Sequence, residues 1–237
     1  MSEWFEEWFG EEYLRLYPHR DDADAERAVG LVRRAVPWRT GLRVLDVGAG
    51  AGRHARALVA AGAWCVGLDL SAPLLRRARQ TTAAPLVRAD MRRLPFRSRS
   101  FDLAVNLFTS FGYFGHDAEH AAVVAAVART LRPGGHLVLD FLNADTVRAA
   151  VAAGDVAAGS LQTAVSRQLS DDGRYVLKTI RVPADRTYTE RVRLLSPDDL
   201  AKMFRDAGLT VERTYGDYDG APLGPGTPRA ILVGRAA

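Results

Sequence analysis

The chain has few cysteines, few lysines and no long apolar run. Its 237 residues include one cysteine, Cys65, and two lysines, Lys178 and Lys202. A single cysteine excludes an internal disulfide and a metal site built from several cysteines. No apolar run approaches the roughly 18 residues of a membrane-spanning helix. The acidic, aromatic start also lacks the basic beginning and apolar centre of a signal peptide. We therefore expect a cytoplasmic protein that makes no membrane contact.

Basic charge comes almost entirely from arginine and is spread along the chain. The 32 basic residues exceed the 28 acidic ones, which gives a formal net charge of +4. Arginine pairs such as Arg92 and Arg93 alternate with acidic residues, whereas a nucleic-acid-binding chain more often carries a basic block. We therefore expect no nucleic-acid partner. The length and the 48% hydrophobic content suit one globular α/β domain.

Strands and helices are expected to alternate from about residue 41 onward. Apolar runs typical of strands occupy 43–47, 64–69, 86–89, 101–106 and 136–143. Helical patterns between them occupy 51–61, 71–81 and 118–131, with a turn at 132–135. A helix capped by Ser196 and two strands, 209–215 and 229–234, close the chain. This order predicts a doubly wound sheet with right-handed crossovers.

Two segments fall outside this alternation. The first 36 residues resemble two helices, and the aromatic residues Trp4, Phe5, Trp8 and Phe9 recur at helical spacing, which suits a packing face or a lid. Three strand-like segments, 162–169, 175–183 and 188–194, predict a small antiparallel sheet. The single domain 1–237 then divides into an N-terminal helical cap (1–37), a cofactor-binding core (38–143), an inserted lid (144–195) and a closing helix with strands (196–237).

The most informative motif ends the first predicted strand, where Asp46 precedes Gly48, Gly50 and Gly52. Glycine lets the chain turn sharply and bring backbone N–H groups against a ligand, and the following helix points its positive end there. The spacing differs from the G-x-G-x-x-G of nicotinamide-binding folds. Asp46 would repel a pyrophosphate and attract a cationic amine or sulfonium. The motif therefore favours a positively charged ligand without a pyrophosphate.

Polar residues also end the neighbouring predicted strands. Asp69 lies about 20 residues beyond the glycine turn, where an acid can accept both hydroxyls of a ribose. Asp90 and Met91 follow the third strand, where they can meet an adenine edge. Asn106 and Leu107 end the fourth strand and lead into an aromatic run. Because ligands bind at the carboxyl ends of parallel strands, we expect these residues to share one site.

Taken in order, segments 46–52, 67–71, 88–91, 101–105 and 131–135 resemble the class I S-adenosylmethionine-dependent methyltransferases. The resemblance implies a Rossmann-like, seven-stranded sheet whose last strand is antiparallel. It also implies S-adenosyl-L-methionine as the cofactor. The residues themselves predict no metal site, since His116 and His120, although four apart, are not expected to share a continuous helix. By position, the resemblance places the cofactor against Asp46, Gly48, Ala49 and Gly50, with Asp69 at the ribose, Leu70, Asp90 and Met91 at the adenine, and Asn106 and Leu107 beside the sulfonium.

The acceptor is less defined by the sequence. Residues 106–109 lack the N-P-P-[YF] motif of enzymes that methylate bases or glutamine. The N-terminal helices and the β insertion resemble those of small-molecule N- or O-methyltransferases, amino-sugar N-methyltransferases included. We therefore predict methyl transfer to an N or O atom of a small molecule by a monomer or homodimer. The alternatives are an RNA- or protein-directed methyltransferase and a cofactor-binding protein without turnover.

Several residues are candidates for catalysis and for closing the site. His116 is the first candidate for a base, because histidine titrates near neutral pH, and Tyr113 is the second. Tyr17 and Arg20 are expected to reach the cofactor from the lid, with Arg20 paired to its carboxylate. Further candidates for the acceptor pocket are Asn143, Tyr215, Asp217 and Tyr218.

Overall fold

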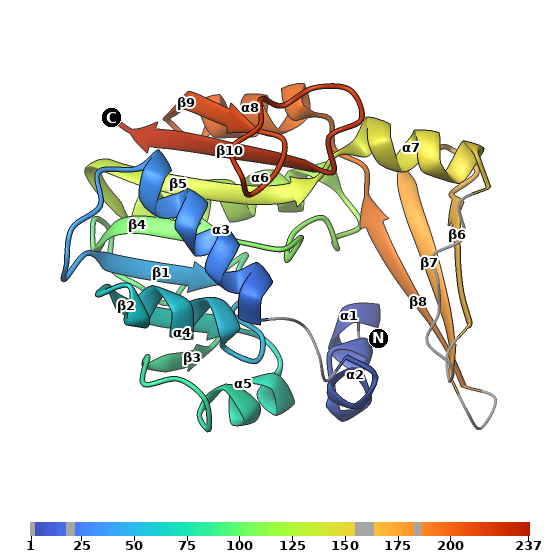
Figure 1. The fold of residues 1–237 in the computed structure, drawn as a ribbon, viewed down its shortest axis with the longest axis horizontal. Coiled ribbons are helices and arrows are strands. Elements are labelled where there is room, and N and C mark those ends of the chain that lie inside the picture. Colours follow the sequence, from blue (N-terminus) through green and yellow to red (C-terminus); the bar gives the residue numbers. More distant parts are fainter. Residues whose placement is uncertain (1–2, 18–21, 155–163, 183–185) are drawn as a thin grey trace.

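The computed structural model describes residues 3–17, 22–154, 164–182 and 186–237. Its centre is a seven-stranded sheet of order β3-β2-β1-β4-β5-β10-β9 (Figure 1). The strands are β1 (Arg43–Val47), β2 (Trp64–Asp69), β3 (Leu86–Arg88), β4 (Phe101–Asn106), β5 (Leu131–Leu142), β9 (Leu209–Tyr215) and β10 (Arg229–Ala236). β10 is antiparallel to both of its neighbours, and the pairs among β1–β5 are parallel. The predicted sheet with an antiparallel last strand is confirmed.

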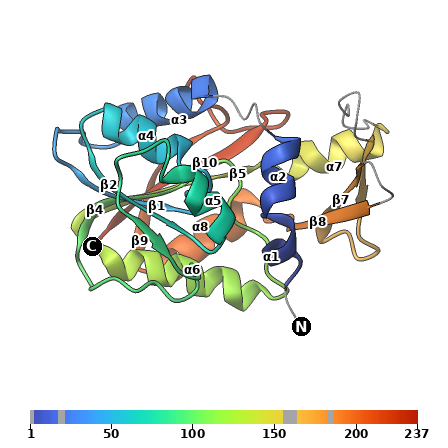
Figure 2. The same ribbon diagram turned by 90° about the horizontal axis from the view of Figure 1, so that it is seen from below.

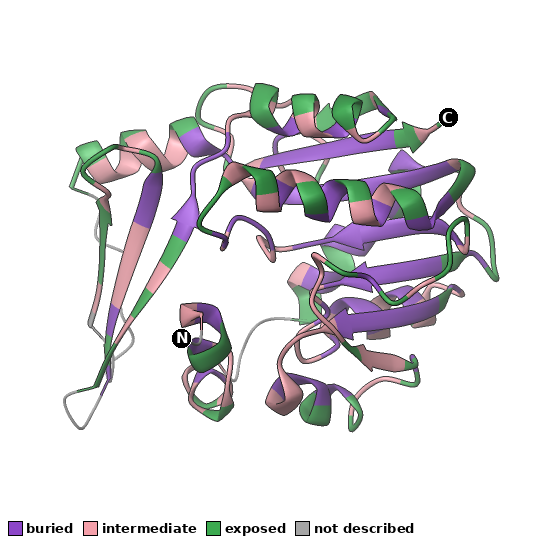
Figure 3. Ribbon diagram, turned by 180° about the vertical axis from the view of Figure 1, so that it is seen from behind, coloured by how far each residue is buried: buried purple, intermediate pink, exposed green. Residues whose placement is uncertain are grey.

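Helices cover both faces of this sheet. α3 (Asp22–Ala35) and α4 (Arg53–Ala60) pack on one face, and α6 (Asp117–Thr130) and α8 (Pro197–Asp206) pack on the other. The strands between them are buried while the outer helix faces are exposed (Figure 3). β4 is buried at every position, as expected for a central parallel strand. In the described residues, no helix has the length and apolar character needed to span a membrane.

Local sequence explains where several elements begin. The Ser71 hydroxyl accepts a hydrogen bond from the Leu74 N–H and caps α5 (Ala72–Ala78). Ser196 caps α8 in the same way, and Pro197 takes its first position. β5 differs from the prediction because it begins at Leu131 instead of after a turn at 132–135. Its pairing with β4 shifts in register there, so the glycine-rich segment is an irregularity within the strand.

The predicted insertion is a separate three-stranded antiparallel sheet. It contains β6 (Ala164–Leu169), β7 (Tyr175–Val182) and β8 (Arg186–Arg193), with β7 in the centre. α7 (Ala144–Ala152) connects the core to it. The first two residues of the predicted segment 162–169 and the last residue of 175–183 lie outside the described residues.

The N-terminal helices α1 (Trp4–Trp8) and α2 (Glu11–Leu16) lie between the carboxyl ends of the parallel strands and the small sheet (Figures 1 and 2). The Trp8 indole N–H donates to Glu190 of β8 at 2.7 Å, and Glu11 pairs with Arg76 of α5 at 2.7 Å. Phe5 and Trp8 are buried, and Phe5 and Phe9 line a cavity. The aromatic stripe therefore serves both for packing and as part of a roof.

Candidate functional site

A cavity of about 1070 Å³ is lined by residues of α1 and α2 and by residues at the carboxyl ends of the parallel strands. Its volume lies slightly above the usual range for small-molecule sites, which is about 300–1,000 Å³. It brings together ten of the predicted site residues, which are Tyr17, Gly48, Ala49, Gly50, Asp69, Leu70, Asp90, Met91, Leu107 and Tyr113. Residues from four separate strand ends and from the N-terminal helices therefore meet at one place, as the carboxyl-end rule for parallel sheets predicts.

Other predicted residues lie elsewhere. Asp46 and Asn106 are 1% and 3% exposed and lie behind the cavity lining. His116 is exposed at the start of α6, where its backbone N–H donates to Glu119 at 3.2 Å, and it does not line the cavity. The structure therefore does not support His116 as the base, because the chain leaves the cavity after Phe114 to begin α6. Arg20 lies outside the described residues.

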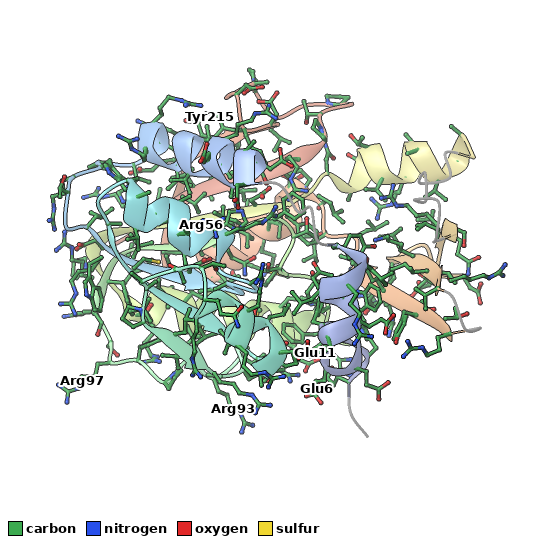
Figure 4. The ribbon with its side chains drawn as sticks, turned by 60° about the horizontal axis from the view of Figure 1, so that its bottom comes forward. Glu6, Glu11, Arg56, Arg93, Arg97 and Tyr215 are labelled. Carbon is green, nitrogen blue, oxygen red and sulfur yellow. The ribbon has the colours of Figure 1, made fainter. Side chains whose placement is uncertain are left out.

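The four further candidates for the acceptor pocket also lie outside the cavity lining. Asn143 caps α7 and donates to the Gly224 carbonyl at 3.1 Å. Asp217 accepts three backbone N–H groups of its own loop, and Tyr218 donates to the buried Asp140. Tyr215 lies beside α3, away from α1 and α2 (Figure 4). These four residues therefore support the fold and do not line the cavity.

The glycine turn presents a different surface from the one expected. The N–H groups of Gly48 and Ala49 both donate to the Leu68 carbonyl, at 2.8 and 2.9 Å, and the Gly50 N–H donates to Asp69 Oδ2 at 2.8 Å. The expectation that these amides face a ligand is therefore wrong, because they bind β2 and its end. A phosphate needs such donors, so the turn is a poor cradle for a pyrophosphate.

Glycine is required at position 48 for two reasons. Its φ is 77°, a left-handed value that other residues rarely adopt, and an added Cβ would lie 2.6 Å from the Ser110 Cβ. Gly50 is also left-handed, at 54°, but its nearest neighbour would be a Leu74 methyl carbon at 4.0 Å. Gly48 therefore allows close contact between the β1 turn and the turn that follows β4.

Asp46 has an unsatisfied carboxylate oxygen. In the described part of the chain, its buried Oδ2 has no hydrogen-bond partner. Burial, and then the charge of Asp69, raise its pKa to about 7, although Arg53 and the Ala55 amide oppose this change. A buried acceptor without a donor is destabilising. Its charge would attract a cationic group at the glycine turn from behind the cavity lining, so the residue fits a ligand that carries an ammonium group.

Asp69 is held rigidly at the end of β2. Its Oδ1 accepts from the Ser71 N–H and its Oδ2 from the Gly50 N–H, both at 2.8 Å. Burial raises its pKa, while these backbone hydrogen bonds act in the opposite direction. Each oxygen of a carboxylate can accept more than one hydrogen bond. The fixed carboxylate can therefore also accept a pair of ligand hydroxyls.

Arg92 forms several hydrogen bonds with Asp90, which lines the cavity. It binds Asp90 through its backbone and its guanidinium, and also contacts Glu3 at 2.9 Å and Glu119 at 2.6 Å. Burial acts to raise the pKa of Asp90, but the hydrogen bonds and charge of Arg92 outweigh it and lower the pKa. The sequence prediction missed this role, since Arg92 stood out only as one of a scattered arginine pair. Its neighbour Arg93 points to solvent (Figure 4).

One wall of the cavity is aromatic. The ring centroids of Tyr113 and Phe9 are 5.4 Å apart. Those of Phe9 and Tyr13 are 5.0 Å apart, and those of Tyr13 and Tyr17 are 5.1 Å apart. All four rings line the cavity. The Tyr113 hydroxyl donates to the Thr109 carbonyl, which fixes the ring beside the turn after β4. Aromatic faces attract cations and pack against apolar ligand surfaces.

Comparisons with known proteins agree with this geometry. Residues 44–135 match a family model described as "Methyltransferase domain". A demethylmenaquinone methyltransferase of Mycobacterium sp. (strain KMS) is 43% identical over 109 residues, 46% of this chain and 45% of that protein. The chain thus matches about half the length of that relative.

Two other similarities extend over most of the chain. The dTDP-3-amino-3,6-dideoxy-alpha-D-glucopyranose N,N-dimethyltransferase of Streptomyces fradiae is 31% identical over 223 residues, 90% of this chain and 85% of that protein. The structure of the CcbJ methyltransferase from Streptomyces caelestis superposes with a TM-score of 0.79 at 20% identity, over 97% of this chain and 98% of that one. The latter similarity concerns the fold alone.

Proposed function

The chain belongs to the class I S-adenosylmethionine-dependent methyltransferases, and from this premise we propose that it methylates an amine nitrogen of a small molecule. The observation that carries the proposal is the aromatic wall of Phe9, Tyr13, Tyr17 and Tyr113 in the same cavity as the glycine turn. The cavity has a polar side for the cofactor and an aromatic side for the acceptor.

The polar side fits S-adenosyl-L-methionine by its donors and acceptors. We assign the ammonium group to the part of the cavity beside the glycine turn, where the charge of Asp46 attracts it from behind the lining, the ribose hydroxyls to Asp69 and the adenine edge to Asp90 and Met91. The glycine turn, in which the Gly48, Ala49 and Gly50 amides are already bonded, suits a ligand without phosphates. When bound, the cofactor supplies a methyl group activated by a sulfonium.

The aromatic side favours an amine as the acceptor. Aromatic rings can hold a protonated amine near the site by cation–π attraction. Once the amine has lost this proton to water, its lone pair can take the methyl group, and S-adenosylhomocysteine is the leaving group. A phenol or alcohol usually needs a general base, and the predicted base His116 lies outside the cavity. The relative from Streptomyces fradiae is an N,N-dimethyltransferase, which supports nitrogen as the attacked atom.

Calorimetry and product analysis test this proposal. We expect S-adenosyl-L-methionine and S-adenosylhomocysteine to bind, and amino sugars or other amines to gain 14-dalton increments on nitrogen by mass spectrometry. Matched phenols and alcohols should stay unmodified. Absence of binding at about millimolar ligand, equivalent to an affinity weaker than about 4 kcal/mol, would remove the cofactor assignment, and methylation of phenols alone would remove the amine.

Replacement of Asp69 should weaken cofactor binding without blocking it. Asp69→Ala removes a charged acceptor, and such hydrogen bonds contribute about 1–3 kcal/mol, so the Kd should rise roughly 10- to 100-fold. Asp171→Ala, in the exposed hairpin turn between β6 and β7, is a matched control and should bind as wild type. Titration calorimetry together with melting temperatures separates lost affinity from lost stability. Equal affinity in both variants would remove Asp69 from the site.

A further inference from the structure

The turn that follows β4 has a strained backbone. Phe108 and Thr109 have φ values of 59° and 61°, and among the described residues only Arg99, at 57°, is another non-glycine residue with positive φ. This geometry brings Cβ close to the following carbonyl oxygen, and the branched Cβ of Thr109 adds to the crowding. Two consecutive residues of this kind persist only where their surroundings hold them.

A buried carboxylate on β5 holds both residues. Asp140 has 0% exposure, and its Oδ2 accepts from the Phe108 N–H at 2.7 Å. The Asp140 backbone carbonyl accepts from the Thr109 N–H at 3.2 Å. Both amides of the strained pair are therefore bound by one residue of the neighbouring strand.

Two side chains from the end of the chain complete this arrangement. Arg229, the first residue of β10, donates from Nε to Asp140 Oδ1 at 2.7 Å and from Nη2 to Thr109 Oγ1 at 2.9 Å. The Tyr218 hydroxyl donates to Asp140 Oδ2 at 2.6 Å. We call Asp140, Arg229 and Tyr218 the clamp. None of the three lines the cavity, so the clamp acts on the site through the turn.

The turn in question forms part of the cavity wall. Leu107, Phe108 and Ser110 line the cavity, and the Ser110 hydroxyl donates to the Gly48 carbonyl at 3.3 Å. The Tyr113 hydroxyl donates to the Thr109 carbonyl. A shift of Thr109 would therefore move contacts to both the glycine turn and the aromatic wall.

We propose that the clamp is a positioning device for methyl transfer, which keeps Phe108 and Thr109 left-handed so that Ser110 and Tyr113 stay aligned with the glycine turn. This inference rests on the proposed function. Transfer needs the nucleophile, methyl and sulfur in line, and a displacement of about 1 Å can lower a rate roughly 100-fold. The cofactor contacts after β2 and β3 do not depend on the clamp. Its loss should therefore lower turnover far more than cofactor affinity.

Arg229→Lys is the variant of choice, because it keeps the buried charge while lysine lacks the planar fork that reaches Asp140 and Thr109 together. We expect kcat to fall about 10- to 100-fold, with the Kd for S-adenosyl-L-methionine within about threefold of wild type. Amide hydrogen exchange over residues 107–114 should accelerate in the cofactor-free protein. This second readout needs no methyl transfer, so it stays informative if the proposed function fails. Tyr218→Phe, which removes one donor to Asp140, should act in the same direction and serves if Arg229→Lys does not fold.

A glycine rescue distinguishes positioning from general stability. Glycine adopts left-handed φ without strain, so Thr109→Gly added to Arg229→Lys should restore part of kcat. Arg99→Gly relieves the same kind of strain in the exposed loop before β4, and should leave kcat unchanged in both backgrounds. The proposal is overturned if Arg229→Lys lowers only the melting temperature, with kcat and exchange over 107–114 as in wild type. It is also overturned if Arg99→Gly rescues as well as Thr109→Gly.

Discussion

Asp46→Asn is expected to stabilise the free protein and, at the same time, to weaken its binding of S-adenosyl-L-methionine. Both effects come from the buried, unsatisfied Oδ2 at the glycine turn. In the free protein, the ionised carboxylate is desolvated without a compensating donor. In the complex, the same charge would attract the ammonium group of the cofactor. One substitution should therefore move stability and affinity in opposite directions.

The stability effect has a definite pH window. The pKa of Asp46 is raised from its ordinary 3.8 to about 7, so between these values the folded protein binds a proton that the unfolded chain has released. Stability therefore falls as pH rises from about 4 to 7 and stays low above 7. Asparagine does not ionise, so the gain at pH 8 should reach at most about 4 kcal/mol. Melting temperatures of both proteins at pH 5 and pH 8 measure it.

The binding effect has the opposite sign. Wild-type affinity should fall as the pH drops below about 7, because Asp46 must release its proton to bind a cation. Titrations near pH 6.5 in buffers of different ionisation enthalpy should show that release, and Asp46→Asn should abolish it. At pH 8 the variant should bind roughly 10- to 100-fold more weakly, because it loses a charge attraction of about 1–3 kcal/mol. Equal affinity of the two proteins at pH 8 would contradict the assignment of Asp46.

Asp102→Asn is a matched control for this experiment. Asp102 is also a buried aspartate, on the neighbouring strand β4, but it accepts from the Arg43 N–H at 2.8 Å and pairs with Arg39 and Arg132. It lies at the amino-terminal end of the sheet, away from the cavity. Its replacement should therefore lower stability and leave cofactor affinity unchanged, the reverse of the Asp46 result.

Gly48→Ala is expected to abolish cofactor binding, whereas Gly50→Ala should only weaken it. Both glycines are left-handed, so alanine carries a similar backbone strain of about 1–2 kcal/mol at either position. Only at position 48 does the new Cβ lie 2.6 Å from the Ser110 Cβ. That contact must displace the β1 turn or the turn after β4. We expect a loss above about 100-fold for Gly48→Ala and about tenfold for Gly50→Ala.

A second substitution, at Ser110, tests whether contact with the Ser110 Cβ causes the loss of affinity in Gly48→Ala. Ser110→Gly removes the Cβ that Gly48→Ala would meet, so the double variant should regain part of the affinity. The same change added to Gly50→Ala should bring no gain. Titration calorimetry on the wild type, Gly48→Ala, Ser110→Gly and their double variant gives the coupling between positions 48 and 110. Similar losses for Gly48→Ala and Gly50→Ala, or the absence of any rescue, would show that the contact with Ser110 is unimportant.

Patterns in the sequence were sufficient for the strands and for much of the cavity. Strand ends at Asp69 and Asp90 are visible as apolar runs that stop at an acid, and the carboxyl-end rule then places both residues at one site. The same reasoning failed for His116, because nearness in the chain to the aromatic run did not keep it at the cavity after α6 began. It also gave the wrong orientation for the amides of the glycine turn, which depends on the Leu68 carbonyl of the next strand.

The sequence alone determined the order of strands and helices, the glycine turn and its leading acid, since each depends on residues close together in the chain. Only the tertiary structure decided which polar groups found partners. Arg92 joins Glu3 to Glu119, and Arg229 joins Thr109 to Asp140, across separations that no local pattern records. Asp46 remained without a partner for its Oδ2 in the described chain. Hydrogen bonds and ion pairs act over a few ångströms, so their partners are set by how the elements pack.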